Sequence, residues 1–102
     1  MLFSAAFAFL ALAVSTVSAE THTVTFDNRC NTGTPTLISN TGTVLSTGGA
    51  YTTNAALFGA IAYLQTGGCG FNGDHCTMVE ITLRNPPSPG AGSSVDLTLI
   101  PP

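Results

Sequence analysis

Basic residues are nearly missing from this chain of 102 residues. It has no lysine and only two arginines, Arg29 and Arg84, and its formal net charge is -3. Nucleic-acid phosphates and anionic membrane surfaces are bound by clustered cations, so neither is an expected partner. Charged residues make up 7% of the chain, and such a weakly acidic surface suits neutral polymers or small neutral ligands.

Long helical patterns are also missing. The abundance of glycine, threonine and proline (11 Gly and 6 Pro) excludes coiled coils and long helices. A hydrophobic fraction of 44% with regular alternation excludes disorder. No Gly-rich loop stands between a strand and a helix, so no phosphate-binding cofactor is expected. The chain is short enough for one domain at most, and the sequence predicts an all-β domain.

Residues 1–19, MLFSAAFAFLALAVSTVSA, form an apolar block that ends in small residues. Its apolar centre has the length of a secretory h-region, although no basic residue precedes it. We predict a signal peptide cleaved after Ala19, with an uncleaved membrane anchor as the alternative. Residues 20–102 would then be secreted, to the extracellular space or the cell wall, without membrane association.

Strand-like alternation begins directly after this block and continues to the end of the chain. Polar turn residues separate the segments, and residues 57–64 are an apolar run that fits a strand or a short helix. Gly59 in the middle of that run favours a strand. The spacing of the segments is typical of an antiparallel β-sandwich. The predicted strands before the last two are residues 21–26, 36–39, 43–46, 50–53 and 57–64.

The last two predicted strands form a hairpin around a Pro/Gly/Ser turn. Residues 77–84 and 94–100 alternate strictly between apolar and polar side chains. If the hairpin folds about Ser88, paired residue numbers sum to 176, and apolar residues then meet apolar residues. Glu80 lies directly opposite Asp96 in this register. A slip of two residues is the alternative, which would keep the two faces and lose this direct pairing.

This carboxylate pair needs a chemical explanation. Like charges directly opposite each other destabilise a sheet. One interpretation is an exposed, hydrated pair without a role. The other is a site, because two adjacent carboxylates can share a proton, bind a cation, grip sugar hydroxyls, or act as acid and base on a glycosidic bond.

Three cysteines leave one without a partner in the chain. Cys69 and Cys76 bracket a short Gly-rich loop, which predicts a disulfide worth roughly 2.5 kcal/mol. Cys30 is then a free thiol, an intermolecular bridge, or half of a bond whose partner is missing. A metal site built from these two loop cysteines with Asp74 and His75 is the weaker alternative, and no metal is expected.

These features together resemble the thaumatin-like proteins, especially short secreted forms of mushroom-forming fungi. The matching segments are VTFDNRC at residues 24–30, LSTGGAYT at residues 45–52, the Cys69–Cys76 loop and the hairpin. They follow in the family's order, over most of residues 21–102. The resemblance corresponds to the amino-terminal half of such a protein only. It therefore implies a sandwich incomplete at the carboxyl end, with strand edges open to self-association.

The resemblance also implies an acidic cleft beside a β-sandwich with disulfide-stapled loops. Family members are secreted, and some bind or slowly hydrolyse β-1,3-glucans. Glu80 looks like the Glu of the family's acidic motif and Asp96 like its first Asp, whereas the motif's Arg falls near Gln65 and looks replaced. The cysteine that matches Cys30 normally bonds to one at the far carboxyl end.

We therefore expect a secreted protein that binds cell-wall β-1,3-glucan through Glu80 and Asp96. The first alternative is a weak endo-β-1,3-glucanase, with Glu80 as the acid and Asp96 as the base or charge stabiliser. The second is a structural or truncated fragment without activity.

Overall fold

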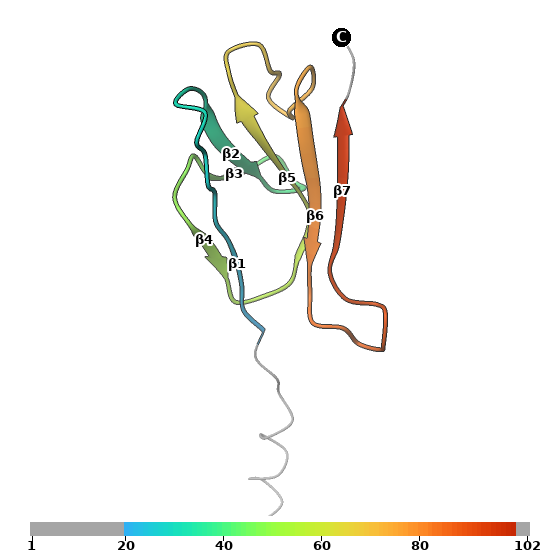
Figure 1. Ribbon diagram of the computed structural model, residues 1–102. Helices are drawn as coiled ribbons and strands as arrows, with labels where there is room; N and C mark the ends of the chain where they lie inside the picture. The colour runs from blue at the N-terminus through green and yellow to red at the C-terminus, as the bar shows by residue number, and fades with distance from the viewer. Residues whose placement is uncertain (1–19, 100–102) are drawn as a thin grey trace, which may run out of the picture.

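A computed structural model describes residues 20–99 of the chain, so the predicted signal peptide lies outside the described residues (Figure 1). This part of the chain contains strands and no helix. The all-β, antiparallel prediction is confirmed. The strands are β1 (His22–Val24), β2 (Thr34–Ile38), β3 (Val44–Ser46), β4 (Tyr51–Thr53), β5 (Leu57–Gln65), β6 (Thr77–Leu83) and β7 (Ser94–Leu99).

The strands form a five-stranded sheet and a separate two-stranded sheet. The larger sheet has the order β3-β2-β5-β6-β7, and the smaller one pairs β1 with β4 (Figure 1). The main core lies where the two sheets meet, because hydrophobic side chains of both belong to one cluster. Its buried members, all from the larger sheet, are Leu37, Leu57, Ala60 and Ile81, and Val24 and Tyr51 of the smaller sheet pack against them.

A second, smaller core lies on the opposite face of the larger sheet. Ile38, Tyr63 and Met78 are buried there, with Ile61 and Cys69 packed against them. The alternation along β6 correctly puts Met78 on the same face as Glu80, yet the former is 3% exposed and the latter lies in the open. The larger sheet is therefore buried on both faces at this end.

The predicted hairpin register is confirmed. β6 and β7 pair antiparallel with Val79 opposite Leu97, Ile81 opposite Val95, and Glu80 opposite Asp96. The connection contains a turn closed by the N–H of Ala91 donating to the carbonyl of Ser88 at 3.1 Å. Pro89 and Gly90 occupy its central positions, and Gly90 has φ +82°, the combination that a type II turn requires.

Two strand boundaries differ from the prediction by two residues, and the others differ by one residue or not at all. The second strand was expected to begin after Pro35, but β2 begins at Thr34 and pairs Pro35 with Leu64 of β5. Proline is tolerated there because β3 pairs only with Leu37 and Ile38, so no strand on that side needs its missing N–H. The first strand is shorter than residues 21–26 because its partner β4 has three residues.

Candidate functional site

Glu80 and Asp96 lie opposite each other on neighbouring strands, and both are exposed. Side chains in this relation are about 4.5–5.5 Å apart at Cβ. Within residues 20–99 neither carboxylate forms an ion pair. Arg84 follows the last residue of β6 and makes other contacts. Its Nε donates to the carbonyl of Ala91 at 2.9 Å, and its guanidinium lies 5.9 Å from the centroid of the Phe58 ring.

The two carboxylates line a hollow of about 640 Å³ on this face of the sheet, which we call the acidic hollow. Ile61, Glu80 and Asp96 form one cross-strand row of the sheet within it. Its volume falls within the range of about 300–1,000 Å³ typical of ligand sites. The lining residues are Ser39, Asn40, Gly59, Ile61, Asn72, Met78, Glu80, Asp96 and Thr98.

The turn between β2 and β3 forms one wall. Ser39 holds this turn together through two hydrogen bonds with Thr43. The backbone N–H of Ser39 donates to the carbonyl of Thr43 at 2.8 Å, and the Oγ of Ser39 accepts from the N–H of Thr43 at 3.0 Å. The N–H of Gly42 donates back to the carbonyl of Ser39 at 3.0 Å. The exposed Asn40 sits in this tight turn, so its side chain is presented at the rim of the acidic hollow.

A bulge in β5 shapes the middle of the acidic hollow. The pairing with β6 shifts by one residue between Leu57 and Ala60, and Gly59 between them has φ +61°. This is the left-handed residue that one common type of bulge uses. Its N–H leaves the regular ladder and donates to Oγ1 of Thr82 at 3.1 Å. A Cβ on Gly59 would lie 3.6 Å from the Cβ of Asn40, so the bulge passes close beneath that side chain.

The disulfide loop supplies Asn72 to the far end of the acidic hollow. Tyr63 anchors the loop by donating from its hydroxyl to the carbonyl of Phe71 at 2.6 Å. Burial, and then the nearby Asp74 carboxylate, raise the pKa of Tyr63, so the hydroxyl keeps its proton over a wider pH range. Gln65 holds the other side, because its Oε1 accepts from the N–H of Cys69 at 3.2 Å.

The predicted disulfide between Cys69 and Cys76 is present. The bond occupies both sulfurs, so the alternative of a metal site using them as thiolate ligands is wrong. Within the described range, His, Cys, Asp and Glu form no group of three that could hold a metal ion. Cys30 is free and exposed.

Four polar side chains of the acidic hollow have no hydrogen-bond partner within residues 20–99. Among the described residues, no hydrogen bond involves the side chains of Asn40, Asn72, Glu80 or Asp96. Two carboxylates that accept and two amides that both donate and accept match the hydroxyl groups of a sugar. Ile61, which is partly exposed, adds an apolar surface that would contact a sugar ring face.

Sequence reasoning found the two acids and missed the two amides. Asn40 and Asn72 lie in segments that the sequence marks only as turns and a Gly-rich loop. The one signal that could have found them is that loops joining strands of one sheet end at its edges, where polar side chains collect.

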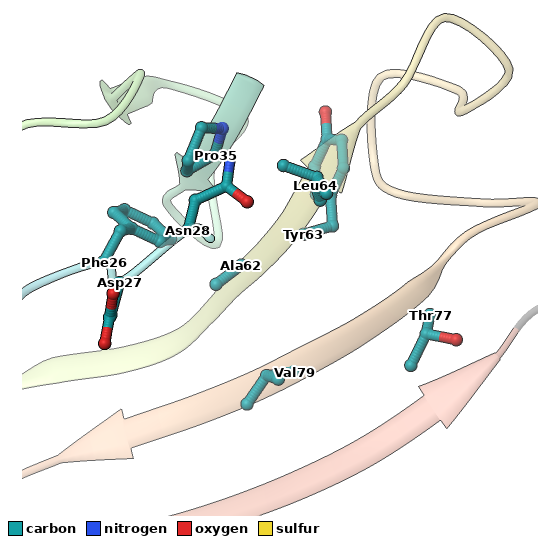
Figure 2. Close-up of a pocket in the computed structure, with 9 residues that line it drawn as sticks. All are labelled: Phe26, Asp27, Asn28, Pro35, Ala62, Tyr63, Leu64, Thr77 and Val79. Carbon is teal, nitrogen blue, oxygen red and sulfur yellow. The ribbon is translucent and has the colours of Figure 1, made fainter. Parts of the chain in front are cut away.

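A second hollow, of about 270 Å³, lies on the opposite face. Figure 2 shows Phe26, Asn28 and Pro35 on one side of it, with Ala62 and Val79 on the strands across from them. Its lining is mostly apolar. The carboxylate at its rim, on Asp27, accepts from Nε of Arg29 at 3.0 Å. This apolar hollow is smaller than typical ligand sites and lacks the acidic pair.

No protein-family model, no curated protein and no solved structure matches this chain. A search of the described residues for a helix of membrane-crossing length and hydropathy finds none.

Proposed function

We propose that this chain is a secreted, thaumatin-like protein that binds β-1,3-glucan of a cell wall in the acidic hollow. The observation that carries the proposal is the opposed pair of Glu80 and Asp96, which shares the acidic hollow with two amide side chains. To the same hollow Asn40 and Asn72 add amide side chains without hydrogen-bond partners in the described part of the chain. The pair costs stability, and a ligand that bonds to both carboxylates would explain its presence.

The charge of the chain supports a neutral ligand. The formal net charge is -3, and no Lys or Arg lines the acidic hollow. Anionic polymers would be repelled there, whereas sugar hydroxyls can donate to both carboxylates. The two-sheet core and the loop closed by a disulfide support the thaumatin-like part of the proposal, in which residues 20–99 form part of a β-sandwich.

Binding fits the acidic hollow better than hydrolysis. A glycosidase holds its two carboxyl groups about 5–5.5 Å or 6.5–9.5 Å apart and keeps its acid protonated in a water-poor setting. Opposed strand positions could reach the shorter range, but both Glu80 and Asp96 are exposed to water. The proposal is therefore a binding protein with little or no turnover.

The test is co-sedimentation of the purified protein with insoluble β-1,3-glucan. Glu80→Gln and Asp96→Asn should each weaken binding. Asp27→Asn is the matched control, because it removes an exposed carboxylate from the opposite face and should leave binding unchanged. Equal binding by all four proteins would overturn the proposed site, and no binding by the wild type would favour an inactive structural fragment.

Release of reducing sugar, measured in the same samples, tests the glucanase alternative. We expect release at the level of protein-free controls. Release by the wild type that is lost in Glu80→Gln would identify a hydrolase and would replace the binding proposal.

A further inference from the structure

β7 carries the three most exposed large hydrophobic residues of the described chain. β7 is the last strand of the five-stranded sheet, so within residues 20–99 its one hydrogen-bonded neighbour is β6. Val95, Leu97 and Leu99 project from one face of it and are 67%, 68% and 58% exposed. The alternation assigns these three to the apolar side, where Val79 and Ile81 of β6 lie partly or fully buried.

Apart from the charge of Asp96, the usual protections of a strand edge are missing from β7. Natural edges are guarded by short length, proline, lysine or a bulge. β7 has six residues with neither proline nor lysine, and its pairing with β6 runs without a register shift. The opposite edge, β3, has three residues, and its pairing is interrupted by a shift. The two edges of the sheet therefore differ, and β7 is the one able to accept another strand.

We propose that β7 pairs antiparallel with β7 of a second copy of this chain, forming a closed dimer with one continuous sheet. A twofold axis perpendicular to the sheet relates two antiparallel copies of the same strand. Residues opposite each other in an antiparallel pair point to the same face. Paired residue numbers must therefore have an even sum, which leaves few registers to consider.

Two registers use β7 nearly in full, and charge decides between them. A sum of 192 places Asp96 opposite Asp96 of the second copy, which opposes like charges. A sum of 194 places Asp96 opposite Thr98, Val95 opposite Leu99, and Leu97 opposite itself on the axis. Every apolar residue then meets an apolar residue, and every carboxylate meets a hydroxyl.

In this proposal the charge of Asp96 determines the register in which the two β7 strands pair. A charge on an edge strand can block pairing altogether. Here it blocks one register and leaves its neighbour open, because Thr98 is two residues away on the same face. The pairing is isologous, so it uses the β7 edge of each copy. No β7 edge is left over, and assembly through β7 stops at two copies.

The first experiment measures mass against concentration for the full chain by sedimentation equilibrium. The wild type should show a reversible monomer–dimer equilibrium. Leu97→Lys places two ammonium groups against each other on the axis and should weaken dimerisation about tenfold or more. Val44→Lys puts the same change on the other edge, at a residue 46% exposed, and should behave as the wild type.

A monomer at every soluble concentration would overturn the proposal. Open-ended oligomers would also overturn it, as would equal weakening by Val44→Lys. Leu97 is two-thirds exposed, so its replacement should leave the fold intact, which circular dichroism checks.

The second experiment tests the register by crosslinking in a Cys30→Ser background. Leu97→Cys should give a disulfide dimer under mild oxidation, because the two thiols meet on the axis. Val95→Cys should not, since its partner is Leu99 of the other copy, but Val95→Cys combined with Leu99→Cys should. Equal crosslinking by the two single variants would contradict this register.

Discussion

Glu80 and Asp96 face each other across β6 and β7, and the described chain offers no cation to separate them. Both also line the acidic hollow, together with Asn40 and Asn72. The arrangement concentrates hydrogen-bond acceptors at one point of an otherwise weakly charged surface.

Removing one of the opposed charges should stabilise the fold. Glu80→Gln should raise the free energy of unfolding by about 0.2–1 kcal/mol, because it relieves like-charge repulsion. Asp96→Asn should do the same. The double variant should gain no more than either single one, since the repulsion is gone after the first change. Urea denaturation of the four proteins measures the coupling, and additive gains would contradict the prediction.

A side chain at the β5 bulge should strain the backbone. Gly59→Ala should lower the free energy of unfolding by roughly 1–2 kcal/mol, because φ +61° disfavours any residue with a Cβ. Gly49→Ala is the matched control. Gly49 does not have a left-handed φ, and a Cβ added to it would have no atom within 4 Å. Equal losses at both positions would count against a specific role for the bulge.

Loss of the disulfide should destabilise the chain through its unfolded state. Replacing Cys69 and Cys76 together by Ala should lower the free energy of unfolding by about 2.5 kcal/mol, the loop-closure value for a separation of 7 residues. Cys30→Ala should change it little, because Cys30 is exposed and free. Denaturation midpoints of the wild type, the double variant and Cys30→Ala measure these changes. A wild type that is equally stable with and without reductant would refute the prediction.

The carboxylate of Glu20 should make stability depend on pH. Its Oε1 lies 2.8 Å from Nε2 of His22 and accepts from the N–H of Asn85 at 2.6 Å. The His22 hydrogen bond, followed by the Asn85 one, lowers the pKa of Glu20 from its usual 4.5. The folded chain therefore binds this proton more weakly than the unfolded chain.

The sign follows from this difference. The ionised carboxylate stabilises the fold fully above pH 4.5, and the contribution is lost as pH falls through the lowered pKa of the folded state. Glu20→Gln should be less stable than the wild type at neutral pH, and the two should converge in acid. Thermal unfolding at a series of pH values measures this, and parallel curves would be the contrary result.

The sequence alone determined the strands, the register of the last hairpin and the disulfide, because each depends on a pattern within a short segment. Alternation identified the strands, and turn chemistry around Ser88 together with matching faces gave the register that places Glu80 opposite Asp96. The Cys69–Cys76 disulfide was equally local, because a short Gly-rich loop separates its two ends. Each of these depends on residues that are close in the chain or joined by one turn.

The tertiary structure alone decided what surrounds the acidic pair and what β7 leaves open. Asn40 and Asn72 reach the acidic hollow only because β2 pairs with β5, and because Tyr63 pins the disulfide loop over the same face. Alternation shows which residues share a face and not whether another layer covers that face. Burial of Ile81 and exposure of Leu97 therefore follow from the position of the β1–β4 sheet, which contacts distant in sequence determine.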